Sequence, residues 1–160
     1  MPTETTAVPL ITSETLLHNW QEHRRLTRRT IEAFPEDKLF TFSIGGMRPF
    51  GDMAFEMISM AVPGVHGVST GDWSRITYPK PATKADLLRL WDEHTALLNE
   101  EFPKIPPAQF FALHKVFDQW EKPGIVTIQY AIDNEIHHRG QGYAYLRGLG
   151  IDPPPFWERN

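Results

Sequence analysis

The sequence contains no cysteine among its 160 residues. Disulfide bonds, zinc–thiolate sites and thiol nucleophiles are therefore excluded, and any bound metal has to take nitrogen and oxygen ligands. No apolar run approaches the roughly 20 residues that a membrane-spanning helix needs. The N-terminal residues also lack the basic flank and apolar stretch of a secretory signal. We expect a soluble, cytoplasmic protein with no membrane partner.

An excess of positive charge is also missing. The formal net charge is -4 and the sequence pI is about 6.0, which gives no electrostatic footprint for nucleic acid. The basic run HRRLTRR at 23–29 is the one concentration of positive charge. Its spacing suits the solvated outer face of an amphipathic helix. Nucleic-acid binding through this run is the weaker alternative, and we expect no nucleic-acid partner.

Four segments show the periodicity of amphipathic helices, and connections rich in proline and glycine separate them. A hydroxyl of Thr12 or Ser13 is expected to cap the first helix, and Thr83 the third, because such a side chain accepts from the free amides of the first turn. Pro63 and Gly64 are expected to end the second helix. The predicted helices are residues 13–34, 50–62, 84–102 and 124–149.

Two connections are long. Residues 64–83 form an irregular crossover, and loops of this length in compact domains are usually functional. Residues 105–124 are ambiguous, since their apolar side chains suit short strands, a short helix or an irregular segment. Four helices with long connections predict an all-α four-helix bundle, built as a single domain over residues 1–160.

The last helix carries an unusual concentration of polar residues in the run DNEIHHRGQG at 133–142. At 100° per residue its isoleucines gather on one apolar face, while a second sector holds Asn134, His138, Gln141 and Tyr145. Charged residues such as Asp133 are left for solvent. A helix with two sectors turned away from solvent is predicted to lie between its own bundle and a partner subunit.

Asn134 and His138 are four residues apart, so both side chains can reach one point beside the helix. Such a pair is a usable half of a metal site. Glu56 of the second helix lies on a stripe of residues expected to be core, where a carboxylate is costly unless it is paired or binds a cation. The alternative to a metal is a buried ion pair, with Arg139 or His23 as candidate partners.

Three stretches then resemble one family. EIHHRGQGYAYLRGLGIDPPP at 135–155 is similar to the end of the last helix in DinB-like proteins, a family of predicted metalloenzymes that includes thiol-dependent transferases and isomerases. WQEHRRLTRRTIEAFPEDKLFTF at 20–42 resembles the opening helix, and MRPFGDMAFEMI at 47–58 the second helix. The order and length of the segments agree over nearly the whole chain.

The resemblance implies a four-helix bundle with up-down-down-up topology, a homodimer, and a divalent metal held by three histidines. One histidine comes from the second helix and two, four residues apart, from the last. At these positions this chain has Glu56, Asn134 and His138. A carboxylate, an amide and one imidazole shift the preference towards harder cations and weaken binding. The expected metal is zinc, nickel, manganese or iron, bound weakly or absent.

Two functions follow from these expectations. The first is a metal-dependent enzyme acting on a small-molecule substrate: a thiol-dependent S-transferase that uses a low-molecular-weight thiol, or a related hydrolase or isomerase, with Gln141 and Tyr145 orienting the substrate. The second is a non-catalytic dimeric bundle that serves as a binding or stress-response module. In that case a hydrogen-bond network among Glu56, Asn134, His138 and a neighbouring cation takes the place of the metal.

Overall fold

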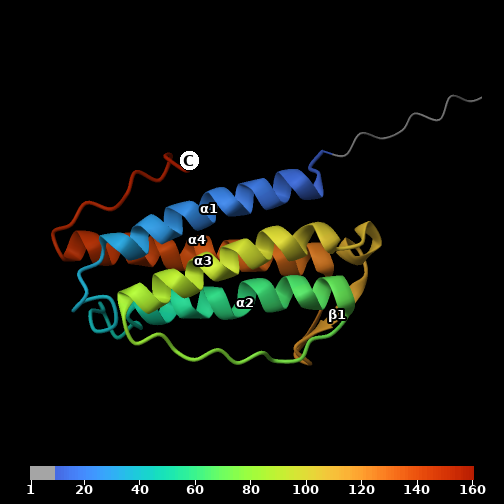
Figure 1. The fold of residues 1–160 in the computed structure, drawn as a ribbon, viewed down its shortest axis with the longest axis horizontal. Coiled ribbons are helices and arrows are strands. Elements are labelled where there is room, and N and C mark those ends of the chain that lie inside the picture. Colours follow the sequence, from blue (N-terminus) through green and yellow to red (C-terminus); the bar gives the residue numbers. More distant parts are fainter. Residues whose placement is uncertain (1–9) are drawn as a thin grey trace, which may run out of the picture.

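A computed structural model describes residues 10–160 and shows four long helices lying side by side (Figure 1). α1 and α2 each pack against both α3 and α4. The mostly helical class is therefore confirmed. No helix of the described part of the chain combines the length and apolar character needed to cross a membrane. The helices are α1 Ser13–Ala33, α2 Phe50–Thr70, α3 Lys84–Glu101 and α4 Gly124–Gly148.

The predicted starts of two helices are confirmed. The Thr12 side chain accepts from the Thr15 amide at 3.0 Å, and the Thr83 side chain accepts from the Asp86 amide at 3.1 Å. Each hydroxyl satisfies one of the amides that the first helical turn leaves without a partner. α4 also begins and ends within one residue of its predicted bounds.

The predicted end of α2 at Pro63 and Gly64 is wrong, because the helix continues to Thr70. An internal proline removes one backbone hydrogen bond and costs about 3 kcal/mol. Here both residues are buried, and the following turns bury further side chains such as Val65, which is 0% exposed. This burial offsets the cost, and the helix ends only at Gly71, whose φ of 79° is left-handed.

The ambiguous segment between α3 and α4 forms two short 3-10 turns and a β-hairpin, so the all-α prediction needs this correction. β1 pairs with β2 in antiparallel register, with Leu113 opposite Pro123 and Val116 opposite Trp120. The hairpin lies at the end of the bundle where α2 ends (Figure 1). The elements are the 3-10 turns Phe102–Lys104 and Pro107–Phe110, and the strands β1 Leu113–Val116 and β2 Trp120–Pro123.

α2 and α4 run antiparallel and approach closely because glycines of α4 face α2. A Cβ atom on Gly142 would lie 2.5 Å from the Phe50 ring, and one on Gly124 would lie 2.8 Å from Val68. Phe50 is 0% exposed and stacks on Phe34 with ring centroids 4.9 Å apart. The ring therefore has no free space into which it can move.

We expect Gly142→Ala to lower the free energy of unfolding by about 1–3 kcal/mol, because the new methyl overpacks the buried contact with Phe50. Gly140 offers the matched control, since a Cβ there meets nothing within 4 Å. Gly140→Ala is expected to stabilise the exposed helix position by about 0.5–1 kcal/mol. Urea unfolding followed by circular dichroism measures both, and equal effects of the two substitutions would contradict the close α2–α4 contact.

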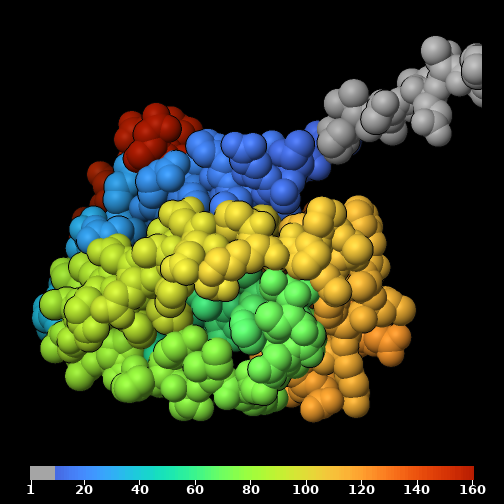
Figure 2. All heavy atoms as spheres, turned by 45° about the vertical axis from the view of Figure 1, so that its right-hand side comes forward, coloured from blue at the N-terminus to red at the C-terminus, as the bar shows by residue number. Residues whose placement is uncertain are grey.

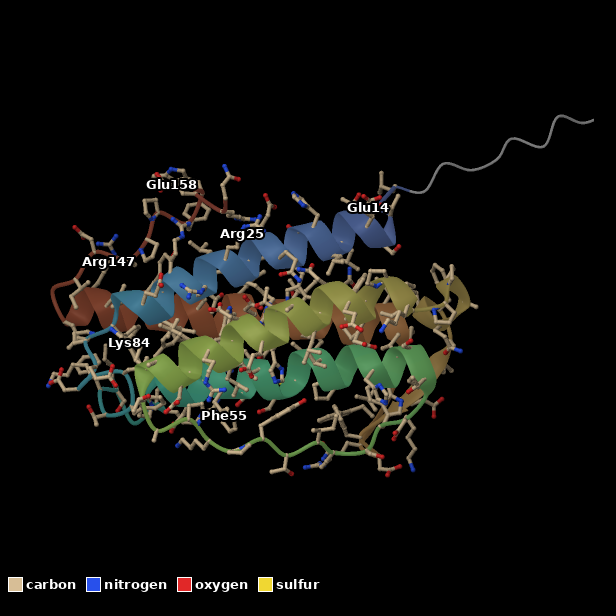
Figure 3. The ribbon with its side chains drawn as sticks, viewed as in Figure 1. Glu14, Arg25, Phe55, Lys84, Arg147 and Glu158 are labelled. Atoms are coloured by element: carbon tan, nitrogen blue, oxygen red, sulfur yellow. The ribbon has the colours of Figure 1, made fainter. Side chains whose placement is uncertain are left out.

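The basic run at 23–29 is not a solvated face throughout, and that prediction is wrong for its first residues. Arg24 is 0% exposed and lies with its guanidinium 4.0 Å above the Trp91 ring. It donates to Thr95 Oγ1 at 2.8 Å and to the Trp91 carbonyl at 3.1 Å, and its NH1 lies 3.9 Å from Glu135 Oε2. Arg25 does lie on the outer side of α1, near the C-terminal segment (Figure 3), where it donates to the Arg159 carbonyl.

Arg24 belongs to a buried polar layer between α1 and α4. Glu135 of α4 is the central acceptor of this layer. It is 1% exposed and accepts from Trp20 Nε1 at 3.1 Å and from Thr27 Oγ1 at 2.7 Å. Arg139, one turn further along α4, donates to the His23 carbonyl at 3.2 Å and lies 3.0 Å from His23 Nδ1. The layer thus joins α1 to α4 by polar contacts inside the bundle.

Candidate functional site

Glu56 of α2 and His138 of α4 meet at the seam between these helices. His138 Nε2 lies 3.1 Å from Glu56 Oε1, and Asn134 Nδ2 donates to the same oxygen at 3.3 Å. The structure therefore brings together all three residues predicted from the sequence. Their contact is observed, whereas their role as metal ligands stays a prediction.

The backbone explains why the three side chains converge. Asn134 and His138 lie one turn apart on the face of α4 that is turned to α2. The tight contact at Gly142, one further turn along, holds the two helices close enough for a glutamate side chain to span the seam. The polar sector of α4 thus packs against α2 of the same chain.

Arg48 is the residue that sequence reasoning missed. Its guanidinium donates to Glu56 Oε2 in a short contact. The partners considered from the sequence, Arg139 and His23, lie instead in the α1–α4 layer, so that part of the prediction is wrong. Tyr145 holds the Arg48 backbone, because its hydroxyl donates to the Arg48 carbonyl at 2.9 Å.

His138 is fixed from its other side as well. Its Nδ1 lies 2.6 Å from Gln141 Oε1, and the Gln141 amide nitrogen reaches Met47 Sδ at 3.5 Å. Gln141 therefore positions the imidazole. Tyr145 is 0% exposed, so it cannot contact a substrate and instead stabilises the backbone of the site.

The carboxyl group of Glu56 is held in its charged form. Partial burial raises its pKa, but hydrogen bonds from Arg48, Asn134 and His138 outweigh burial and bring the pKa below 4.5. The carboxylate accepts from all three neighbours, and the positive charge of Arg48 balances its negative charge. The network is thus electrically satisfied by the protein's own groups.

A resident zinc or nickel ion fits this donor set poorly. Asn134 Oδ1 is buried without a hydrogen-bond partner and would be the third donor beside Glu56 and His138, but an amide oxygen is a weak ligand. Arg48 already occupies the second carboxylate oxygen, and its charge repels a divalent ion. Within residues 10–160, no group of three or more histidine, aspartate or glutamate side chains is arranged to hold a metal.

A cavity of about 750 Å³ lies further along the α2–α4 seam. Met60 of α2 and Ala131 of α4, each about one turn from the Glu56–Asn134 contact, belong to its wall. The connection after α2 and the β-hairpin close it from the outside. In Figure 2 the green connection and the orange hairpin border a hollow in the surface. The long crossover, predicted to be functional, therefore forms part of a cavity wall.

Comparison with known proteins agrees with this architecture. The structure is similar to a DinB-like protein of Bacillus subtilis, with a TM-score of 0.75, 18% identity, and coverage of 89% of this chain and 96% of that one. A DinB-like protein of Bacillus cereus gives a TM-score of 0.65 and 18% identity, covering 89% and 95%. At such identities the likeness shows the fold. No curated protein matches.

A model of the DinB family matches residues 83–159. This range contains α3, the hairpin and the whole of α4, and so includes Asn134 and His138 but neither Arg48 nor Glu56. The sequence match and the structural matches lead to one conclusion: residues 83–159 match the DinB family, and the chain has the fold of DinB-like proteins.

Proposed function

We propose that this DinB-like chain is a non-catalytic binding protein in which the Arg48–Glu56–His138 network takes the place of a metal centre. The observation that supports the proposal is the guanidinium of Arg48 on the free oxygen of Glu56. A positively charged side chain is thus present at the position where the family resemblance implies a bound cation. The adjacent cavity supplies the binding site.

The physical basis is the balance of charge at the seam. Glu56 is about two-thirds buried, and a carboxylate there is stable only when charge and hydrogen bonds compensate for lost water. Arg48 and the side chains of Asn134 and His138 supply that compensation without an ion. A divalent cation would have to displace a charge-assisted pair, which lowers its net affinity.

Metal analysis of untagged protein is the first test. We expect far less than one metal ion per chain, and a melting temperature that a strong chelator leaves unchanged, because nothing that stabilises the folded state is removed. A large drop in melting temperature, reversed by added zinc, would contradict the proposal. Arg48→Ala serves as the companion variant, since removing the competing cation should increase metal uptake.

The geometry of the seam can be tested by restoring ligands. Glu56→His combined with Asn134→His places three imidazoles where the side chains now meet. We expect this double variant to bind one zinc or nickel ion per chain, with a stabilisation of about 2.7 kcal/mol when the free ion is at a hundred times its Kd. The same variant carrying His138→Ala is the control and should lose the effect.

A metal-dependent transferase is the second candidate function. The unpaired, buried Oδ1 of Asn134 is the observation that favours it, because such an atom has an unmet need for a donor or a cation. Glu56→Ala combined with His138→Ala provides the test. Equal metal content in this variant and in the natural protein would remove the candidate.

The assembly and topology belong to the same proposal. We propose the up-down-down-up order and the homodimer that the family resemblance implies. The antiparallel α2–α4 contact and the parallel α1–α4 contacts, in which Trp20 meets Glu135 and Thr27 meets Arg139, support the topology. Light scattering after gel filtration determines the oligomeric state.

A further inference from the structure

We infer that the cavity beside the network binds a small organic monoanion, with a carboxylate held by Arg75 and an aromatic or other flat apolar body between the walls. The inference deepens the proposed binding role and rests on it. It names the class of ligand, which neither the fold nor the family resemblance provides. Binding of such a ligand can be measured independently of the metal content of the protein.

The size and walls of the cavity suit a small molecule. Its volume of about 750 Å³ falls within the range of roughly 300–1,000 Å³ of ligand pockets. α2, the connection after it, the hairpin and α4 all contribute to the wall. Much of the lining is aromatic, and Met60 adds a polarisable side chain that adapts to irregular shapes. The aromatic lining residues are Phe55, Tyr78, Phe117, Trp120 and Tyr130.

The charge of the lining has one sign. Arg75 and Lys122 are the charged residues of the wall, and no carboxylate is among the lining residues. Of the acidic residues close in sequence, Asp72 pairs with His66 and Asp118 pairs with Lys115. Glu121, between Trp120 and Lys122, does not line the cavity. The cavity therefore offers a cation without a protein counter-charge.

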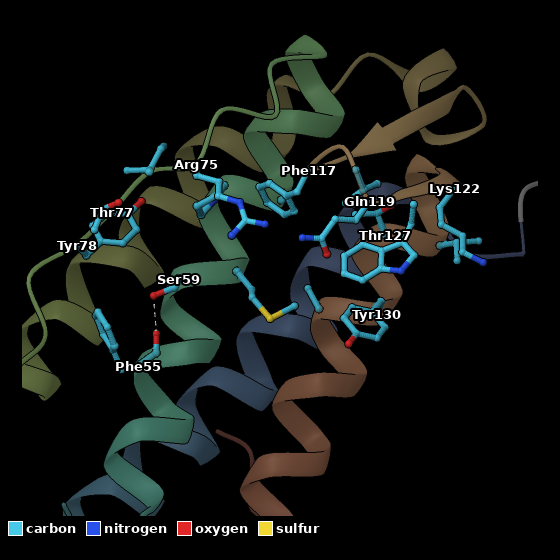
Figure 4. Close-up of a pocket in the computed structure, with 18 residues that line it drawn as sticks. Phe55, Ser59, Arg75, Thr77, Tyr78, Phe117, Gln119, Lys122, Thr127 and Tyr130 are labelled. Atoms are coloured by element: carbon cyan, nitrogen blue, oxygen red, sulfur yellow. Dashed lines mark hydrogen bonds between the residues drawn. The ribbon is translucent and has the colours of Figure 1, made fainter. Parts of the chain in front are cut away.

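Arg75 is an exposed residue of the cavity wall, and the close-up shows how its side chain is turned. Arg75 and Gln119 extend from opposite walls, and their polar ends point towards one another (Figure 4). A guanidinium presents parallel N–H groups that match the two oxygens of a carboxylate, and the Gln119 amide can add one more donor. Lys122 extends away from this point in the same view. One guanidinium and one amide suit a single negative charge better than a polyphosphate.

The rim of the cavity is held in a strained conformation. Phe117 and Asp118 form the hairpin turn with φ of 48° and 58°, a left-handed region that costs side-chain-bearing residues of order 1 kcal/mol or more each. The turn directs Phe117 onto Trp73, with ring centroids 5.3 Å apart, and into the cavity wall. Backbone strain of this kind is concentrated at binding sites.

Large apolar side chains at the mouth remain in contact with water. Trp120 is 56% exposed and Tyr130 is 61% exposed. A second copy of the chain could cover these exposed side chains, but it would also have to fill a cavity of about 750 Å³ and neutralise Arg75. An aromatic carboxylate meets both requirements with one small molecule, because its ring covers apolar surface and its charge pairs with the guanidinium.

The test compares 4-phenylbutyrate with its neutral analogue 4-phenylbutyramide by titration calorimetry on the full chain at low salt. We expect the acid to bind at least about tenfold more tightly than the amide, the effect of one charge-assisted hydrogen-bonded pair. Arg75→Gln should abolish this preference. Arg89→Gln is the matched control, because Arg89 pairs with Glu93 on α3 and does not line the cavity.

A second variant guards against binding elsewhere on the surface. Ala131→Phe fills the cavity from α4 and should abolish binding of both compounds. Equal affinities for acid and amide, an unchanged preference in Arg75→Gln, or binding that persists in Ala131→Phe would each overturn the inference. The inference would also be overturned if the affinity fell when the protein concentration was raised until a dimer formed, because a second copy would then cover the cavity. If the purified protein contained a bound metal and still bound the acid more tightly than the amide, this result would refute the proposed metal-free network but not the inference about the ligand.

Discussion

Replacing Glu135 with leucine is expected to lower the free energy of unfolding by about 3–5 kcal/mol. The carboxylate is 1% exposed and is the acceptor for Trp20 Nε1 and Thr27 Oγ1. Its removal leaves two buried donors without partners and leaves Arg24, itself 0% exposed, without its buried counter-charge. An uncompensated buried charge costs far more than the pair contributes.

The size of this effect is measured by urea unfolding of the single variant and of Glu135→Leu combined with Arg24→Met. Because removing both charges leaves no unpaired ion, the double variant should regain much of the loss. Glu93→Leu is the control, since Glu93 is an exposed partner of Arg89 and should change stability by less than about 1 kcal/mol. If the two substitutions lowered the free energy of unfolding additively, Arg24 would not depend on Glu135 for its counter-charge.

The helices of the bundle could be predicted from the sequence because their signals are local. Thr12 and Thr83 cap the helices that follow them, and apolar side chains recur at helical spacing. The continuation of α2 beyond Pro63 could not be predicted, because it depends on burial of the following turns by other helices. The hairpin was ambiguous for the same reason: apolar residues near Phe110 suit several structures until their neighbours are known.

The candidate site was predicted in part. Glu56 and His138 were found because a carboxylate on a core stripe and a histidine at i, i+4 spacing are visible in the sequence. Arg48 was not, since it precedes α2 and reaches Glu56 from eight residues away, a spacing with no periodic signal. Arg24 did leave a signal: it lies four residues after Trp20 and seven before Ile31, on the buried stripe of α1.

The polar run of α4 now has a physical explanation. Asn134 and His138 face α2, whereas Glu135 and Arg139, each the next residue, face α1. Neighbouring residues on a helix point about 100° apart, so one run of residues serves two interfaces. The run is therefore turned inward only in part, because Asp133 and His137 are exposed.

Stability is expected to fall as the pH drops from 6.5 towards 4, and His23 is a main reason. Burial, together with the nearby charges of Arg139 and Arg159, lowers the pKa of His23 from 6.5 to about 4. Arg139 lies 3.0 Å from His23 Nδ1, which places a cation where a proton would have to bind. The neutral ring is thus the form that fits the fold.

The sign of the effect follows from proton binding. Above pH 6.5 His23 is neutral in both the folded and the unfolded chain, so its contribution is fully present. Below that pH the unfolded chain takes up a proton that the folded chain refuses until about pH 4, and stability is lost progressively over this interval. One pKa unit corresponds to about 1.4 kcal/mol, so the loss is about 2 kcal/mol at pH 4.5.

The experiment compares the wild-type protein with His23→Gln by urea unfolding at pH 7.0 and pH 4.5. Glutamine does not titrate, and its amide oxygen can still accept from Arg139. Carboxylates lose charge in both proteins, so their effect cancels in the comparison, and the wild type should lose about 2 kcal/mol more than the variant. His18→Gln on the exposed side of α1 is the control and should follow the wild type. Parallel pH dependence of wild type and His23→Gln would show that His23 takes up its proton in the folded chain, and that the α1–α4 layer is open to water.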